Sequence, residues 1–305
     1  MAGAAENFRR FIFNDHSLRE EDIPHDLTHV SFDKSITFVP CAFNGHRCIK
    51  ELYCHEGVCK IEDSAFESSS IERAIMPGVE VLEVYAFSHC EDMKYVDCDK
   101  LKIIKDHAFE VCTSLQSLNL SSAEVVGVGA FADLHSMTDA KFGKNLTSFG
   151  DHAFLNCKSM ERITIPLKNG LIPHDNTFQL CSKLNRVDLV DGAILRKTVN
   201  ALLMEEWKND MYNEIDSINQ ILPNTYAGLF ENDENDDAGG KALVIRMWIA
   251  HVLHKIIYYK EKHGQVLKET AATLQSSLPQ DIVQKNVLPF LELPAYTFDG
   301  EDSQR

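Results

Sequence analysis

Phenylalanine recurs along the first two thirds of the chain at nearly constant spacing. Six of the seven copies follow an alanine, and the seventh follows Thr177. Successive copies are separated by 23, 21, 22, 22, 23 and 24 residues. The seven positions are Phe43, Phe66, Phe87, Phe109, Phe131, Phe154 and Phe178. A fixed period of about 20–50 residues indicates a repeat protein, so we expect a solenoid in which these rings stack as a buried spine.

A second pattern, apolar-x-x-apolar-x-apolar, repeats with the same period in eight copies between Leu27 and Leu189. Apolar residues two apart share one face of a strand, and a single short strand buries that face only when coils stack on one another. Apolar pairs such as Leu101 and Ile104 precede most Ala-Phe dipeptides. These patterns predict a solenoid over residues 27–190, with about eight short-strand coils, most of them 22–24 residues long.

After Leu189 the repeat period gives way to a helical one. One apolar stripe with four- and three-residue spacing comprises Leu203, Trp207, Met211, Ile215, Ile218 and Leu222. A second stripe runs from Ile245 to Leu274. The stripes predict amphipathic helices of about 28 and 35 residues, paired as a hairpin over residues 191–278. An acidic loop near 231–240 joins them, and residues 279–305 form a separate C-terminal segment. The hairpin could cap the solenoid, project from it or join two copies.

The N-terminal residues contain an apolar cluster of Phe8, Phe11, Ile12 and Phe13, spaced as one face of a helix would be. A solenoid exposes its core at both ends unless something covers it. We therefore expect residues 1–26 to form an N-terminal cap against the first coil.

The repeat unit resembles the BspA-type leucine-rich repeat, which reads approximately AFxxCxxLxxIxLPxxVxxIxxx. Ala108–Leu120 and Ala153–Pro166 match it almost position for position. The resemblance implies a leucine-rich-repeat solenoid, here in an α+β chain, and bacterial members are known as surface adhesins. The tail, with helices around Trp207 and Trp248, resembles BspA-type proteins of eukaryotic algae, which implies architecture only. One departure is Asn169–Asn176, which replaces the usual apolar pair and lengthens a coil.

Charge narrows the classes of partner. The chain has 30 basic and 46 acidic residues, a net charge of −16, and no basic run. This balance argues against nucleic acid and anionic membrane surfaces as partners, and favours a basic protein if charge contributes to binding. No apolar stretch is long enough to cross a bilayer. Residues 1–10 do not resemble a signal peptide, so we expect a cytoplasmic or nuclear protein.

The repeat explains the positions of six of the nine cysteines. Four follow a spine phenylalanine by three residues, and two more occupy strand positions, which is typical of buried free thiols. These six are Cys90, Cys112, Cys157 and Cys181 in the first set, and Cys54 and Cys98 in the second. Cys41, Cys48 and Cys59 lie outside these series, and whether they pair is left open.

No motif for nucleophilic, phosphate or metalloprotease chemistry occurs in the sequence. His251 and His254 lie one helical turn apart, but a solvent-facing pair is commoner than a metal site. Asp-His dipeptides at Asp106 and Asp151 share one slot of the repeat, which is typical of turns rather than of a catalytic pair. We therefore predict no catalytic residues, no metal site, no cofactor and no enzyme activity.

Recognition is then expected on the outward strand positions, where such solenoids vary their side chains. Five of them form a candidate partner-binding patch with the aromatic and arginine content of binding hot spots. The five are Tyr53, Arg73, Ile75, Tyr95 and Asp97. The plainer interpretation is that these side chains only cover the sheet or lie beneath the N-terminal segment.

The sequence therefore favours a non-catalytic protein-interaction scaffold, with a protein partner whose identity it does not give. One alternative is a secreted or cell-surface adhesin-like protein. Another, from a different class, is an enzyme-associated regulatory subunit. Oligomerisation through the helical tail also stays open.

Overall fold

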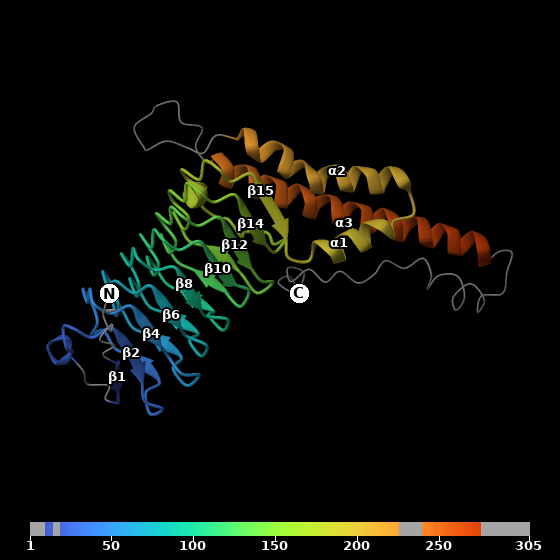
Figure 1. The fold of residues 1–305 in the computed structure, drawn as a ribbon. Helices are drawn as coiled ribbons and strands as arrows, with labels where there is room; N and C mark the ends of the chain where they lie inside the picture. Colours follow the sequence, from blue (N-terminus) through green and yellow to red (C-terminus); the bar gives the residue numbers. More distant parts are fainter. Residues whose placement is uncertain (1–9, 15–18, 226–239, 276–305) are drawn as a thin grey trace, which may run out of the picture.

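The computed structural model describes residues 10–14, 19–225 and 240–275. The chain winds into a solenoid of about eight coils followed by helices (Figure 1). One side of the stack, called here the strand face, carries two sheets. They contain β1 (Arg10–Phe13), β2 (His29–Phe32), β4 (Glu51–Tyr53), β6 (Arg73–Ile75) and β8 (Tyr95–Asp97), then β10 (Ser117–Leu120), β12 (Asp139–Phe142), β14 (Arg162–Ile165) and β15 (Arg186–Leu189).

A third sheet on another side contains β3 (Phe38–Val39), β5 (Lys60–Ile61), β7 (Val81–Leu82), β9 (Ile103–Ile104), β11 (Val125–Val126) and β13 (Ser148–Phe149). The described strands pair in parallel. The coil around Asn169–Asn176 has no strand in this sheet and instead forms η2 (Asp175–Phe178). The leucine-rich-repeat solenoid predicted from the sequence is therefore confirmed, together with the altered coil.

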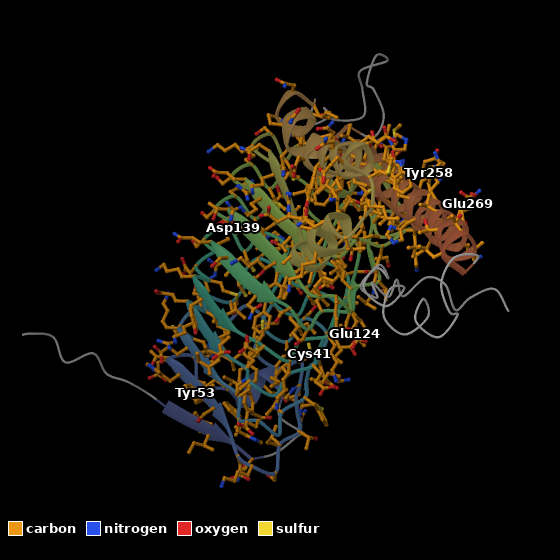
Figure 2. All side chains as sticks on the ribbon, turned by 90° about the vertical axis from the view of Figure 1, so that its right-hand side faces the viewer. Cys41, Tyr53, Glu124, Asp139, Tyr258 and Glu269 are labelled. Atoms are coloured by element: carbon orange, nitrogen blue, oxygen red, sulfur yellow. The ribbon has the colours of Figure 1, made fainter. Side chains whose placement is uncertain are left out.

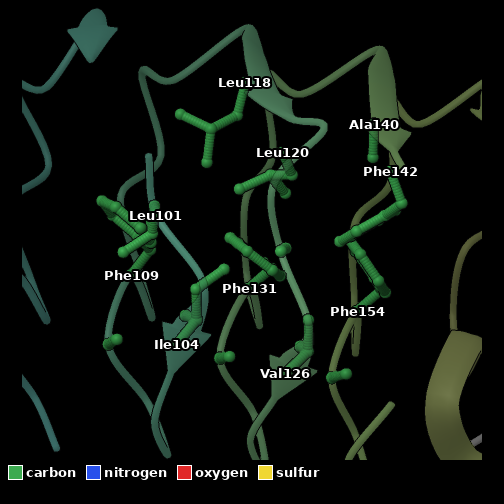
Figure 3. Close-up of a cluster of buried hydrophobic side chains, with 14 of the residues drawn as sticks. Leu101, Ile104, Phe109, Leu118, Leu120, Val126, Phe131, Ala140, Phe142 and Phe154 are labelled. Atoms are coloured by element: carbon green, nitrogen blue, oxygen red, sulfur yellow. The ribbon is translucent and has the colours of Figure 1, made fainter. Parts of the chain in front are cut away.

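The seven phenylalanines stack as a column between the sheets. Neighbouring rings lie 5.0–5.8 Å apart, within 18° of parallel. The Ala-Phe dipeptide also joins the coils through the backbone, because the Phe109 N–H donates to the Ala130 carbonyl at 2.9 Å and other coils repeat this bond. Figure 3 shows rings of the column packed against the inward strand residues, such as Leu118 and Ile104.

Four buried cysteines extend this column with a ladder of thiol hydrogen bonds. Each thiol donates to the backbone carbonyl of the phenylalanine in the preceding coil, at 3.0–3.1 Å. The four are Cys90, Cys112, Cys157 and Cys181. A small side chain with a weak donor suits this slot, since a larger residue would push the coils apart.

Left-handed backbone occurs two residues before and two residues after most spine phenylalanines. Such residues are Ser64, Tyr85, His107 and His152 before the ring, and Ser68, His89, Val111, Asp133, Asn156 and Leu180 after it. Gly45 and Gly129 fill equivalent slots. Left-handed backbone is unfavourable for most residues other than glycine, so the ladder of inter-coil bonds holds these turns in place.

The N-terminal expectation of a helix is wrong. Arg10–Phe13 is strand β1, and it pairs in register with His29–Phe32. The open edge of β2 offers a row of backbone donors and acceptors, and extended chain satisfies them where a helix would not. Phe13 is buried and its ring meets that of Phe43 edge-on at 5.0 Å. Phe8 lies outside the described residues.

The tail contains three helices, α1 (Gly192–Asn200), α2 (Glu205–Ile221) and α3 (Gly240–Gln275). The first long helix expected from the sequence is therefore divided in two. The chain turns between Asn200 and Glu205, and this turn brings the Tyr212 hydroxyl close enough to donate to Asn200 Oδ1 at 2.6 Å. A continuous helix would place these residues roughly 18 Å apart along its axis.

The helices cover the last coil of the solenoid. The Asn219 side chain bonds both backbone groups of Val187, accepting from its N–H at 2.8 Å and donating to its carbonyl at 3.3 Å. Lys241 donates to the carbonyls of Ser182 and Leu184. Burial lowers the pKa of the Lys241 ammonium. These side chains supply the bonds that a further coil would otherwise make.

The hairpin is antiparallel and longer than the coil it covers. Trp207 near the start of α2 stacks on Tyr259 of α3 at 5.7 Å, and the Trp248 indole donates to the Glu214 carbonyl at 2.9 Å. One half lies over the last coil, and the other extends past it (Figure 1). Residues 226–239 and 276–305, which include most of the expected acidic loop and the C-terminal segment, lie outside the described residues.

Candidate protein-interaction face

The strand face presents two outward rows of side chains that run across the coils. Tyr53 is paired in register with Ile75, and Ile75 with Asp97. Arg73 is paired with Tyr95 in the adjacent row. The structure therefore brings the five predicted residues together on β4, β6 and β8, on one face of one sheet.

The two tyrosines stand out from this surface. Tyr53 is 54% exposed and Tyr95 is 49% exposed, although both lie on well-paired strands. The Arg73 guanidinium lies over the Tyr95 ring, 5.0 Å from its centroid, and Ile75, on the intervening strand β6, is half-buried. In Figure 2, Tyr53 and Asp139 lie on the side of the stack that carries the strands. We call Tyr53, Arg73, Ile75, Tyr95 and Asp97 the tyrosine patch.

Most other charged side chains in the two outward rows are paired within the chain. His29 Nε2 lies 3.4 Å from Glu51 Oε2. Arg162 lies 3.9 Å from Asp139 and 3.5 Å from Asp188, and Arg186 also contacts Asp188 at 3.0 Å. These pairs are exposed and contribute little to stability, but they give most of the ionic groups beside the tyrosine patch a partner within the chain.

Arg73 and Asp97 differ from these neighbours. Among the described residues, neither has an ion pair, although both lie among charged side chains. The same is true of Lys141, two coils beyond Asp97. The tyrosine patch thus combines exposed aromatic rings with one unpaired positive and one unpaired negative group.

One neighbour of the patch was missed by the sequence analysis. Ile12 of β1 is 59% exposed and is paired with Ser31, which continues the row of Tyr53. The helical interpretation of residues 8–13 concealed it. The short run Phe11-Ile12-Phe13, rich in aromatic and β-branched residues, is consistent with a strand and is the signal that could have indicated one.

The histidines and aspartates considered for catalysis or metal binding lie in turns of the repeat or on the surface of a helix. His107 and His152 lie in left-handed turns, and the Asp106 carboxylate accepts from the Val128 N–H at 2.8 Å. His251 is exposed, with Nδ1 3.9 Å from Glu214 Oε1. Within the described part of the chain, no three His, Cys, Asp or Glu side chains come together as a metal site would require.

Among the helices that the structure describes, none combines the length and the apolar character needed to cross a bilayer.

The family model for the BspA type leucine rich repeat region matches residues 6–125 and 102–198, in six copies. The chain belongs to the BspA-type leucine-rich-repeat family. Proteins built from such repeats generally mediate protein–protein interaction or adhesion, and they are typically non-catalytic.

Solved structures similar to this BspA-type protein are leucine-rich-repeat proteins. The T. pallidum leucine-rich-repeat protein TpLRR is 21% identical, and the match covers 59% of this chain and 74% of that one, with a TM-score of 0.43. A leucine-rich-repeat protein from Bacteroides ovatus is 22% identical, with coverage of 55% and 60% and a TM-score of 0.37. This BspA-type chain thus spans less than two thirds of the latter. No curated protein sequence matches it.

Proposed function

We propose that this protein is a non-catalytic interaction scaffold that binds a protein partner with the tyrosine patch of its strand face. The observation that carries the proposal is the half-exposure of Tyr53 and Tyr95 on rigid, paired strands. Exposed aromatic rings beside an arginine match the composition of interface hot spots. Because the sheet is preformed, binding there does not require this protein to order a loop, which would cost conformational entropy.

A site-specific cross-link tests this function. A photoreactive phenylalanine analogue in place of Tyr53 is expected to yield a discrete cross-linked protein band in cells. The same analogue in place of Tyr258, which is 42% exposed on α3, serves as the control and should not yield that band.

Truncation of the patch provides the second arm of the test. Tyr53→Ala combined with Tyr95→Ala should abolish capture of the cross-linked partner and leave Tm near the wild-type value, since exposed substitutions rarely change stability. Tyr258→Ala should leave capture intact. Undiminished capture by the double variant would refute the patch as the binding surface.

We further propose that the protein works in a reducing compartment, the cytoplasm or the nucleus. No disulfide joins any of the nine cysteines, all of which lie in the described part of the chain, and six of them are buried. Reduced cysteines in this number are typical of intracellular proteins. Thiol counting on protein isolated from its native cell should give nine; a lower count that rises after reduction would favour export and the adhesin alternative.

A further inference from the structure

The tyrosine patch has an unusual arrangement of charge. Among the described residues it contains one unpaired cation, Arg73, and one unpaired anion, Asp97, while most ionic groups on either side of it are paired. A surface that binds a strongly basic or strongly acidic partner would carry one sign of charge. A patch that carries both signs, one of each, is suited to a partner carrying the same two signs.

The register places these two groups on a diagonal. Arg73 pairs with Tyr95 across β6 and β8, and Ile75 pairs with Asp97 across the same strands. The four residues therefore form the corners of a cell two strands wide. Arg73 and Asp97 occupy one diagonal, and Ile75 and Tyr95 occupy the other.

This cell is complementary to itself. A two-fold axis parallel to the sheet and perpendicular to the Arg73–Asp97 diagonal brings each arginine over the aspartate of a second copy. The same rotation sets Tyr95 against Tyr95 and Ile75 against Ile75. Such an isologous contact, in which each residue meets its counterpart, is the commonest kind in protein oligomers.

The position of the patch leaves room for a second copy. β4, β6 and β8 lie towards the N-terminal end of the stack, and the helices lie at the other end (Figure 1). A stable interface buries about 800 Å² per partner, more than five side chains offer. The contact must therefore include neighbours such as Ser117 on the adjacent strand β10, and we expect a weak dimer.

We propose that the tyrosine patch binds a second copy of this chain, face to face, with Arg73 of each copy paired with Asp97 of the other. This inference rests on the proposed function, because it names the occupant of the same surface. It assigns dimerisation to the strand face and not to the helical tail.

Charge reversal in purified protein tests the dimer, with mass measured by sedimentation velocity over a range of concentrations. The wild type should shift from monomer to dimer as concentration rises. Arg73→Asp and Asp97→Arg should each weaken the dimer by at least about tenfold, because each puts two pairs of like charges in contact. Unchanged Tm would show that each variant folds; where one does not, Arg73→Ala or Asp97→Ala replaces it.

A mixture of the two reversed variants provides the decisive arm. One variant then carries aspartate at both positions and the other arginine at both, so a mixed dimer recovers both ion pairs. We expect the mixture to form a dimer with a dissociation constant within about threefold of the wild-type value. Lys141→Asp, which reverses an unpaired charge outside the patch, should leave the dimer unchanged.

Three outcomes would overturn the proposal. They are a wild type that stays monomeric up to about 1 mM, a dimer that survives both reversals, and a mixture that stays monomeric. If the wild type is monomeric while the cross-link at position 53 still captures a different protein, the dimer fails and the proposed function stands. If neither a dimer nor a cross-link forms, both fail.

Discussion

Single residues in this solenoid hold conformations that their chemistry does not favour. Val111 is the clearest example, since it is β-branched and lies at a φ of 58°. Its N–H donates to the Ala132 carbonyl of the next coil at 2.9 Å, so the inter-coil ladder sets the backbone. The left-handed region costs most L-residues roughly 1–2 kcal/mol, and asparagine tolerates it better.

Val111→Asn is therefore expected to stabilise the protein by about 1 kcal/mol. Thermal melting would show a rise in Tm of about 2–4 °C for a chain of this size. Val125→Asn is the matched control, because Val125 is 41% exposed on an ordinary strand, and it should not raise Tm. A lower Tm for Val111→Asn would mean that packing of the valine outweighs the backbone strain.

The left-handed slots also mark where inference from the sequence stops. The Phe series, the strand positions and the cysteine ladder were visible because one residue type, or one apolar class, recurs in register. The turn slots are filled by serine, tyrosine, histidine, valine, asparagine and glycine in different coils. The two Asp-His dipeptides indicated turns at His107 and His152, but the residues in the other slots share no pattern, and only backbone geometry relates them.

At the scale of elements, the end of the solenoid depends on a few polar side chains. Asn219 of α2 supplies the backbone bonds that β15 would otherwise exchange with a ninth coil. The sequence did not indicate this capping role, because a polar residue on a helix is usually exposed to solvent. The division between α1 and α2 was equally hidden, because the apolar spacing continues through residues 201–204 while the chain turns.

Asn219→Ala should destabilise the protein by about 1 kcal/mol, since it leaves an N–H and a carbonyl of Val187 without these partners. Chemical denaturation would measure the loss. Gln220→Ala, an exposed change in the same turn of α2, is the control and should fall within about 0.5 kcal/mol of wild type. Equal effects of the two changes would rule out a capping role for Asn219.

The contact between α2 and α3 should depend on pH. Burial would raise the pKa of Asp210, but hydrogen bonds from Lys255 at 3.0 Å and Tyr259 at 2.8 Å outweigh it and lower the pKa. Burial and the bond to Asp210 raise the pKa of Tyr259 to about 12. A carboxyl with a lowered pKa stabilises the fold above its ordinary range, and this contribution is lost as pH falls through the lowered value.

Asp210→Asn should therefore lower Tm most near pH 7. The loss in the free energy of unfolding should be less than about 1 kcal/mol, because the Asp210 side chain is 42% exposed. The difference from wild type should shrink as pH falls below about 4. Glu206→Gln on the same helix, which has no ion pair among the described residues, should show no such trend. A difference that stays constant from pH 7 to pH 3 would contradict the assignment.

At the scale of the whole molecule, the cysteines report on the integrity of the stack. Cys41, Cys48 and Cys59 are exposed, and the other six are buried. Burial raises the pKa of Cys90 and of Cys98 to about 12, so few thiolates are present there near neutral pH. Thiol reactivity should therefore divide sharply between the two groups.

In the native protein, a disulfide-exchange reagent should react rapidly with three thiols, and with all nine after denaturation. A variant with serine at positions 41, 48 and 59 should show no rapid phase. Additional rapid reaction in that variant would mean that the coils open under native conditions, contrary to a continuously packed column.

The Asn219 contact has a consequence for the size of the array. Internal coils meet both neighbours through one shared pattern of backbone bonds, whereas Asn219 touches the final strand alone. Gain or loss of one complete internal coil would leave the first strand and the helical end with the contacts they already have. The number of coils is therefore free to vary by duplication or deletion of internal coils, while the helical tail with Asn219 ends the solenoid in the same way.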